Sequence, residues 1–573
     1  MLRDLLARGT PLLCAWSAGK DSTATLNVLL STAAELRAGG QPLAPIIITH
    51  ADTDVENPEV WAHARREMDK IRAFGERHGL DVRVEVSHPP LSAQWAVRVI
   101  GGSALPIFPN AKGRDCTVDL KIKPQQRLRR RLLPELEAGG VRPVTVVATR
   151  FEESASRAER MNKRGDTAHA VRADDDGNLY LTPIADWAAS DVWEYLGLAR
   201  AGQVLAYSDF DDTFRLYADA AGTSCAVVGD DMTRTLQNSR GCGARFGCHQ
   251  CQAVGTDASL ANMVETDPNY HYMRGLNRLQ QFIAATQYDW TRRNWIGRTI
   301  DAAGYVTIQP DLYHPRMLDS LLRYALTIDV EEQNAAAQAG LEAPRFQLIG
   351  LKSLIAIDAE WSRQGVARPF HALSIYRDII ERGARYPVPA VEPIARTSLP
   401  APRYLYVGPD WDEDAQWAYT GLRDPLLEAQ ASDGLSAGCA GSTTSLRDGT
   451  SVLALDSAEF YDIDEEGASL LLAFELDRLI ETYHDDPGYR TTAGYHYYAS
   501  SGLLTLAKGQ ARAVDTILRR TAYKERHGLT GDYDLKALLA RTISAEEHRA
   551  RTGLHTTDTD EPQLPLFAAL SPA

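Results

Sequence analysis

The hexapeptide SAGKDS, residues 17–22, has the residue types of a loop that holds an anion. It follows a short apolar run, 11–16, and precedes a segment with helix-like patterning, which predicts a strand-to-helix turn. Small residues let the backbone bend close to a ligand, and the first N–H groups of a helix lack intrahelical acceptors. The helix dipole and the charge of Lys20 both favour a phosphate at this position. We therefore predict a phosphate-binding loop made of Ser17, Ala18, Gly19, Lys20, Asp21 and Ser22, with Lys20 and Asp21 as catalytic residues.

Four of the seven cysteines are arranged in a way that suggests an inorganic centre. Cys225, Cys242, Cys248 and Cys251 follow the spacing C-x16-C-x5-C-x2-C, with glycines interleaved among the last three. Four thiolates suit either a structural zinc ion or an iron–sulfur cluster, and the residue types alone do not choose between them. We predict that these four cysteines are metal ligands.

Cys116 stands apart in a basic stretch that runs from Lys112 to Arg131 and has eight basic residues against two aspartates. Nearby cations lower a thiol pKa and favour the reactive thiolate, so we expect Cys116 to be catalytic, either as a sulfur-relay residue or as another kind of reactive residue. A position close to the metal centre is the alternative. The stretch itself is either an anion-binding stripe or a solvated helix face. Cys14, in an apolar strand, is expected to be a packing residue, and Cys439 receives no role.

The elements that must position these residues alternate between strand and helix over residues 1–205, as in a parallel α/β sheet. Strands are expected at 11–16, 44–52, 81–86 and 143–150. Asp52 and Asp54 come at the end of the second of these strands. In a doubly wound sheet, the ribose or adenine of a nucleotide is bound at that edge.

Helices are expected to connect these strands, the first at 20–36. Asn57 and Pro58 predict the start of a second helix, whose apolar residues recur near the helical period. Ser190 is a candidate N-cap for a later helix. After residue 205 we expect a cysteine-bearing segment at 206–268, helices at 269–400, an irregular linker at 401–450, helices at 451–552 and a disordered tail at 553–573.

The composition agrees with a globular protein outside the membrane. The chain has 573 residues and a formal net charge of -15, which argues against a protein that coats nucleic acid unaided. No apolar run approaches the roughly 20 residues that cross a bilayer. The first residues lack a convincing signal-peptide pattern, so we expect a cytoplasmic location.

The loop at 17–22 resembles the S-G-G-K-D-S signature of the PP-loop ATP pyrophosphatases, with Ala18 in place of a glycine. The resemblance implies a doubly wound parallel sheet of the adenine nucleotide α-hydrolase type. It also implies that ATP is cleaved between its α and β phosphates, with Mg²⁺ bridging the phosphates near Asp21 or Asp52.

Four further segments resemble the branch of this family that includes phosphoadenosine-phosphosulfate (PAPS) reductase. They are HADTDVENPEV, RDCTVDLKIKP, TRFEESASRAERM and PIADWAASDVWEYL. The resemblance covers about residues 10–265. It implies nucleotide contacts from Asp52, Asp54, Arg114, Lys121, Lys123, Arg150 and Arg157, of which the arginines can clamp phosphates with two donors each.

The segment ARFGCHQCQAV resembles the DndC family of DNA phosphorothioation sulfurtransferases, and SspD, the counterpart in single-strand systems, is equally compatible. His249, Gln250 and Gln252 depart from the usual pattern but leave the ligands in place. The resemblance implies a [4Fe-4S] cluster, DNA as substrate, a cysteine desulfurase as sulfur donor, and other phosphorothioation-system proteins as partners in antiviral defence.

The function expected from these features is ATP-dependent activation of a DNA backbone phosphate, followed by sulfur insertion. Three alternatives stay open: a PAPS reductase-like enzyme, a tRNA thiolase, and a nucleotide-sensing scaffold in a defence complex. PAPS reductases carry a C-terminal E-C-G-x-H motif, which this sequence lacks. Separately, Gln563 to Phe567 (QLPLF) resembles the peptide by which bacterial proteins bind the replication sliding clamp.

Overall fold

A computed structural model describes residues 1–108, 115–221, 246–412, 441–445, 451–455, 460–507 and 510–553. Arg114, Cys225, Cys242, Cys439 and the Gln563–Phe567 peptide lie outside these ranges. None of the helices in the described ranges combines the length and apolar composition needed to cross a membrane.

The chain divides into two compact units. Unit 1 comprises Met1–Pro89, Cys116–His249 and Thr256–Asn277, and unit 2 comprises Pro90–Asp115, Gln250–Gly255 and Arg278–Ala573. The sequence did not indicate that the segment from Pro90 belongs with the C-terminal half.

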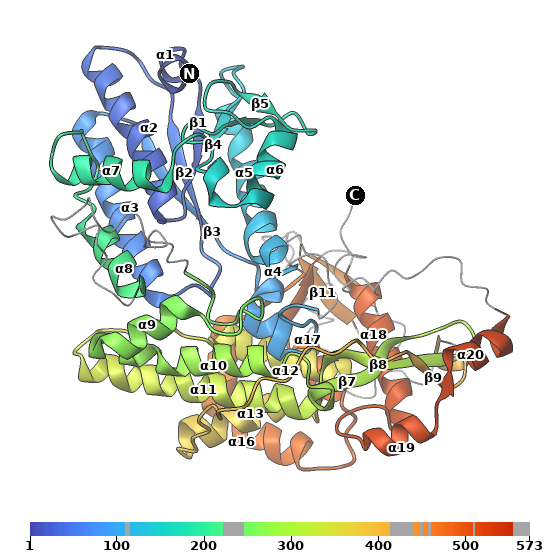
Figure 1. Ribbon diagram of the computed structural model, residues 1–573. Coiled ribbons are helices and arrows are strands. Elements are labelled where there is room, and N and C mark those ends of the chain that lie inside the picture. The colour runs from blue at the N-terminus through green and yellow to red at the C-terminus, as the bar shows by residue number, and fades with distance from the viewer. Residues whose placement is uncertain are drawn as a thin grey trace. The chain divides into compact units, whose positions relative to one another are not determined.

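A six-stranded sheet in the order β3-β2-β1-β4-β6-β5 forms the centre of unit 1 (Figure 1). Every neighbouring pair is parallel except β5 with β6, which confirms the predicted α/β class with a parallel sheet. Because β2 and β3 lie on one side of β1 and β4 lies on the other, the strand order reverses between β1 and β4. Ligands of such sheets bind outside the carboxyl ends of the strands at this reversal. The strands are β1 (Leu12–Ala15), β2 (Ile46–Ala51), β3 (Val82–Ser87), β4 (Val144–Val146), β5 (Arg172–Ala173) and β6 (Leu179–Leu181).

Helices cover both faces of this sheet. Side chains alternate along β1, so that Leu12 and Cys14 join one apolar cluster while Leu13 joins the other. The first cluster includes α2, α3 and α7, and the second includes α5, on opposite sides of the sheet in Figure 1. The helices of unit 1 are α1 (Leu2–Ala7), α2 (Lys20–Ala38), α3 (Pro58–His78), α5 (Lys123–Leu136), α6 (Ala155–Arg164), α7 (Ala189–Arg200), α8 (Asp211–Ala221) and α9 (Ala258–Thr266). Two helices span a division between the units: α4 (Asp115–Thr117) and α10 (Arg274–Ala285).

The two predicted helix caps had different outcomes. Asn57 caps α3 as expected, with its side-chain oxygen 2.9 Å from the Glu59 nitrogen. The prediction for Ser190 was wrong, because α7 begins one residue earlier and Ser190 lies inside the first turn. The Asp191 carboxylate instead accepts from the Ala188 nitrogen at 2.8 Å.

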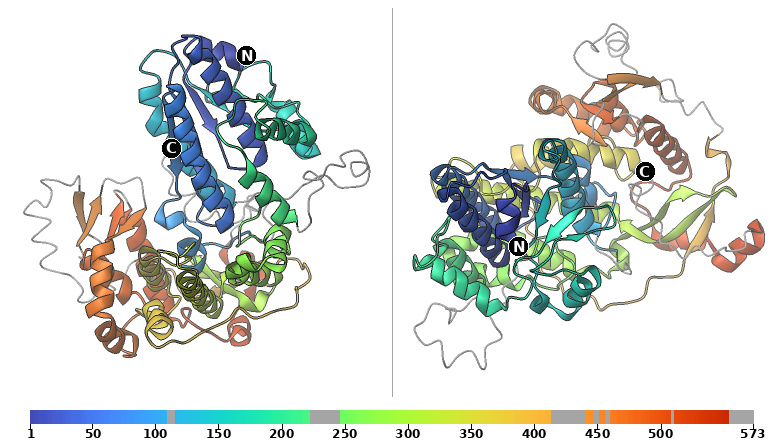
Figure 2. Two further views of the ribbon diagram at one scale, coloured as in Figure 1. Left: turned by 90° about the vertical axis from the view of Figure 1, so that its left-hand side faces the viewer. Right: turned by 90° about the horizontal axis from the view of Figure 1, so that it is seen from above.

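Helices make up most of the regular structure of the described part of unit 2, but the unit also contains two four-stranded sheets that were not expected. One sheet, β14-β9-β8-β7, is antiparallel throughout. In it the hairpin of β7 and β8 lies beside β9, which is far along the sequence from both strands (Figure 2). The other, β10-β11-β13-β12, is mixed. The strands are β7 (Arg293–Ile300), β8 (Tyr305–Tyr313), β9 (Arg403–Tyr406), β10 (Gly441–Ser445), β11 (Ser451–Leu455), β12 (Tyr461–Ile463), β13 (Leu504–Ala507) and β14 (Ile543–Ser544).

A fully enclosed helix, α12 (Leu351–Gln364), lies at the centre of unit 2, where every residue from Ser353 to Arg363 is buried. The buried carboxylate of Asp358 forms hydrogen bonds within the unit. It accepts from the Ala372 nitrogen at 2.7 Å and from the Tyr498 hydroxyl at 3.0 Å. The other helices of unit 2 are α11 (Pro315–Gln338), α13 (His371–Tyr376), α15 (Glu465–Phe474), α16 (Leu476–Leu479), α17 (Ala493–Ser500), α18 (Ala511–Arg526), α19 (Leu535–Ala540) and α20 (Ala545–Thr552). Short π-helical or 3-10 turns occur in both units and include η2 (Ala96–Ile100) in unit 2, and η3 (Val118–Ile122) and η4 (Phe151–Glu153) in unit 1.

Candidate functional site

The predicted phosphate loop is a closed turn between β1 and α2. Ser22 holds it together, because its hydroxyl oxygen accepts from the Ser17 nitrogen at 3.1 Å and donates to the Gly19 carbonyl at 2.9 Å. The chain reverses at Ala18, whose φ is +58°, and α2 begins at Lys20. The turn therefore aims the start of a helix at the carboxyl end of the sheet, as predicted.

Ala18 holds a backbone conformation that glycine adopts with less strain. The left-handed region costs an alanine roughly 1 kcal/mol relative to glycine. We expect Ala18→Gly to leave the free energy of unfolding unchanged or to raise it by up to about 1 kcal/mol, because strain relief offsets the added freedom of the unfolded chain. Urea denaturation measures the change. Ala73→Gly, at an exposed position inside α3, is the control and should lose about 1 kcal/mol; an equal loss in both variants would contradict the strain argument.

A network of charges adjoins the turn. The Lys20 side chain is 10% exposed, and its Nζ lies 2.7 Å from Asp21 Oδ2. The other carboxylate oxygen of Asp21 lies 2.6 Å from Nε of Arg150, which follows β4 and is buried. Arg150 also donates to the Trp187 carbonyl at 3.1 Å. Two predicted cations from opposite sides of the strand reversal therefore share one carboxylate.

Two glutamates extend this network, and the sequence did not single them out. Glu153 accepts from the Arg150 backbone nitrogen at 3.2 Å and forms an ion pair with Arg157. Glu152 lies 3.2 Å from Arg150 Nη1 and accepts from the Ala189 nitrogen at 2.5 Å. The only sequence signal was their place inside the same charged run as the two arginines.

The first N–H of α2 has a partner that the sequence did not reveal. The Lys20 nitrogen donates to the Tyr217 hydroxyl at 3.1 Å, and Tyr217 comes from α8, far along the chain. The Tyr217 ring packs edge-on against Trp193, with centroids 5.2 Å apart. Trp193 is buried, as a packing residue would be.

A second group of charges follows β2. The Asp54 nitrogen donates to Asp52 Oδ1 at 3.0 Å, and His88 Nδ1 lies 3.6 Å from Asp52 Oδ2. One ligand atom from each of Asp52, Asp54 and His88 lies within 4.8 Å of the others. Asp52 and Asp54 were predicted to lie here, whereas His88 was not singled out.

This second group favours a cation. Partial desolvation, followed by the charges of Asp52 and Glu56, raises the pKa of Asp54 to about 7, although the residue still reaches solvent. Desolvation likewise raises the pKa of Asp52. Lys121 Nζ, 3.1 Å from Glu56 Oε1, supplies one positive charge. A divalent cation would relieve the remaining repulsion, and the two carboxylates fit the oxygen preference of Mg²⁺, whereas an imidazole is more typical of transition metals.

Three of the described cations in the basic stretch around Cys116, namely Lys121, Lys123 and Arg131, are paired with acidic residues. Lys123 Nζ lies 3.1 Å from Asp119 Oδ1, and Arg131 Nη2 lies 2.9 Å from Glu85 Oε2. Cys116 is half-buried in α4. By contrast Cys14 is fully enclosed in β1, where burial raises the pKa of its thiol to about 12, as expected for a packing residue.

Two of the four predicted metal ligands, Cys248 and Cys251, are described, and both are half-buried. Cys248 forms an antiparallel bridge with Glu56, and the neighbouring His249 nitrogen donates to the Val55 carbonyl at 3.1 Å. Cys248 and His249 thus pair with residues 55–56, which directly follow Asp52 and Asp54 in the sequence. In unit 2, the Cys251 sulfur accepts from the Ala253 nitrogen at 3.3 Å.

Comparison with known proteins adds little to this geometry. No family model matches the sequence, and no curated protein matches it. Among solved structures, the chain is similar to phosphoadenylyl-sulfate (PAPS) reductase from Candida auris in its phosphate complex, with 12% sequence identity and a TM-score of 0.18. The match covers 34% of this chain and 74% of that one.

Proposed function

We propose that unit 1 is an ATP pyrophosphatase of the PP-loop type. The observation that carries the proposal is the closed Ser17–Ser22 turn at the strand reversal, where Lys20 from the start of α2 and Arg150 from the end of β4 converge on Asp21. A nucleotide bound there would place its phosphates on a helix N-terminus and two cations. The carboxylates after β2 adjoin the same edge of the sheet.

Each residue has a role in this proposal. Lys20 and Arg150 neutralise the charge that develops on departing pyrophosphate, and Asp21 orients both cations before ATP arrives. Arg157, positioned by Glu153, is a further phosphate contact. Asp52 and Asp54 would hold Mg²⁺, which supplies charge neutralisation on the triphosphate. Lys121 balances the acidic charge beside them.

The finer proposal is sulfur transfer to DNA. A non-bridging oxygen of a DNA phosphate attacks the α phosphorus of ATP and pyrophosphate leaves. A cysteine desulfurase passes the outer sulfur of its persulfide to Cys116 and is released as a thiol. The Cys116 persulfide then attacks the DNA phosphorus, and AMP departs with the activated oxygen. A thiol reductant cleaves the remaining S–S bond. Activation is needed because an oxide oxygen is a very poor leaving group, whereas AMP is a good one.

Cys225, Cys242, Cys248 and Cys251 are proposed to hold a [4Fe-4S] cluster, with zinc as the alternative. Their spacing supports this proposal, and so does the bridge between Cys248 and Glu56, which attaches one predicted ligand to the nucleotide-binding edge. Cys116 is proposed as the sulfur carrier.

Product analysis tests the pyrophosphatase. The full chain with Mg²⁺ and DNA should convert ATP into AMP and pyrophosphate, which anion-exchange chromatography resolves from ADP and phosphate. ADP as the product would overturn the proposal, and ATP binding without turnover would favour the scaffold alternative. Replacing DNA with tRNA, or ATP with PAPS and a thiol reductant, separates the thiolase and the sulfonucleotide reductase.

Metal analysis tests the cysteine centre. Protein purified without oxygen should contain about four irons and four sulfides per chain and absorb broadly in the visible range, as expected for a cluster held by four thiolates. Cys248→Ser should lose this absorbance, and Cys14→Ser, at a buried packing position, is the matched control. Stoichiometric zinc without sulfide would assign a structural zinc site instead.

A further inference from the structure

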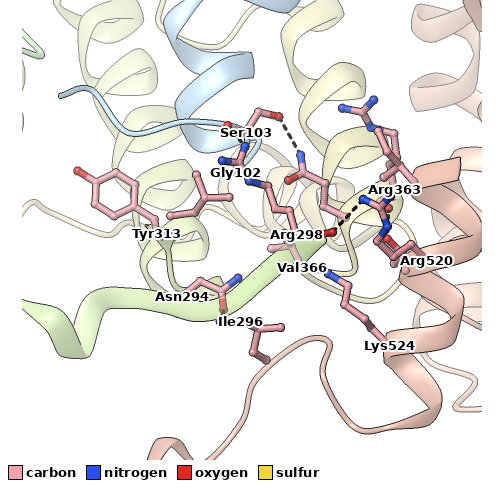
Figure 3. Close-up of a pocket in the computed structure, with 14 residues that line it drawn as sticks. Gly102, Ser103, Asn294, Ile296, Arg298, Tyr313, Arg363, Val366, Arg520 and Lys524 are labelled. Carbon is pink, nitrogen blue, oxygen red and sulfur yellow. Dashed lines mark hydrogen bonds between the residues drawn. The ribbon is translucent and has the colours of Figure 1, made fainter. Parts of the chain in front are cut away.

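Unit 2 contains a cavity of about 50 Å³ to which the proposed function assigns no role (Figure 3). Its walls come from the loop after η2, from β7 and β8, from the end of α12 and from α18. One enclosed water needs roughly 10–15 Å³. The cavity therefore has room for about three to five waters, or for one compact polyatomic ion.

Four cationic side chains line this cavity: Arg298, Arg363, Arg520 and Lys524. No carboxylate is among the described residues that line it. Two of the arginines form ion pairs with carboxylates that do not line the cavity, since Arg298 lies 3.2 Å from Asp311 and Arg363 lies 2.5 Å from Glu360. The surface that faces the cavity is positive.

Of the four cationic side chains, Lys524 has the charge that is least compensated by its neighbours. The residue is only 7% exposed, and its Nζ donates to the Gly297 carbonyl at 3.4 Å, the limit of a hydrogen bond. Within the described part of the chain, no carboxylate lies at ion-pair distance from it. Burial, together with the charges of Arg520 and Arg298, lowers the pKa of Lys524 to about 8.

The neighbours of Lys524 add to the unfavourable charge. Arg520 precedes it by one turn of α18, and like charges at this spacing repel. Arg520 Nη1 donates to the Arg298 carbonyl at 3.2 Å, shown by the dashed line between them in Figure 3. Nε and Nη1 of Arg363, a residue 1% exposed, are buried without an acceptor among the described residues. Buried donors and charges of this kind are costly unless a ligand satisfies them.

We propose that this cavity binds a tetrahedral oxyanion, a phosphate or sulfate group, with Lys524 as its main ionic contact and Arg298, Arg363 and Arg520 around it. An oxyanion supplies acceptors for the buried donors and the negative charge that the lining lacks. The small volume admits the oxyanion group alone, so that any attached nucleoside must extend through the opening. This site is separate from the turn at Ser17–Ser22 and does not depend on the function proposed for unit 1.

Calorimetry with sulfate tests the site, in a Lys20→Ala background that removes anion binding at the turn in unit 1. Lys524→Met keeps the length of the side chain without its charge, and Lys536→Met, at an exposed position of α19, is the matched control. The background protein and the control should bind sulfate equally, whereas Lys524→Met should bind about tenfold or more weakly, as expected for one lost charged contact. Equal binding by all three, or no binding by the background protein, would overturn the proposal.

Thermal unfolding separates binding from a structural role. Without sulfate, Lys524→Met should unfold at the same or a higher temperature, because it removes a buried charge that lacks a counterion. With sulfate, the unfolding temperature should rise in the control and not in Lys524→Met. A variant that is less stable without sulfate would make Lys524 a structural residue and overturn the assignment. Repeating the titration with inorganic phosphate and with AMP distinguishes a free ion from a nucleotide phosphate.

Discussion

Lys20→Ala is expected to lower the rate of pyrophosphate release from ATP by about 10²–10³-fold, the usual loss when one preorganised electrostatic contact to a reacting group is removed. The Lys20 side chain is largely shielded from water, so solvent screens its charge only weakly. Its ion pair with Asp21 is short, which fixes the ammonium before substrate binds. Coupled detection of pyrophosphate at saturating ATP measures the rate.

Lys163→Ala is the control for this variant, because Lys163 is exposed at the last turn of α6. It should retain the full rate. Adding Asp21→Ala to Lys20→Ala should cost little more, since the two residues act as one unit. Pyrophosphate release that persists in the double variant would place the reaction elsewhere in the chain.

Arg150→Met is expected to destabilise the region around the turn by about 2–3 kcal/mol. The Arg150 side chain is 4% exposed and donates to Asp21, to Glu152 and to the Trp187 carbonyl. Methionine fills much of the volume, but the Trp187 carbonyl and Oδ1 of Asp21 lose the Arg150 donor, while Oδ2 of Asp21 keeps Lys20. Hydrogen exchange of peptides from β4 and α2 reports this local free energy of opening.

The matched control for Arg150 is an exposed ion pair in the same unit. Arg131→Met removes the contact with Glu85, but the Arg131 side chain is 68% exposed. Pairs of this kind contribute about 0–1 kcal/mol, so little change is expected. If the two substitutions lower the local free energy of opening equally, the Arg150 network stabilises unit 1 no more than an exposed ion pair does.

Local signals in the sequence were enough to predict much of unit 1. The apolar run before Ser17 and the helical pattern after it located the β1–α2 turn, and Asn57 with Pro58 located the start of α3. These features depend on neighbours in the chain, which periodicity and capping preferences describe directly. The sequence could not predict that Arg150 and Lys20 share Asp21, because that contact joins the ends of two strands.

The strands of unit 2 were missed for a different reason. Arg293 to Tyr313 contains Gly297 and Pro310 inside the strands, and the β7–β8 pairing has irregular register, so the alternation of apolar and polar residues is weak. Tyr217 was missed because nothing in its own segment indicates contact with Lys20. The cavity with the cationic lining was missed because Arg298 and Lys524 are far apart in the sequence and line one cavity only in the folded chain.

The Tyr217 hydroxyl affects how a phosphate group could bind to the Ser17–Ser22 turn. The Lys20 N–H that a phosphate oxygen would accept already serves the Tyr217 hydroxyl. A phosphate oxygen and the Tyr217 hydroxyl would therefore compete for the Lys20 N–H. A bound triphosphate would either displace the Tyr217 hydroxyl or share this donor with it. If the proposed nucleotide binds here, its binding is therefore expected to disturb the contact that anchors α8. This helix ends at Ala221, four positions before Cys225, the first of the four clustered cysteines in the sequence.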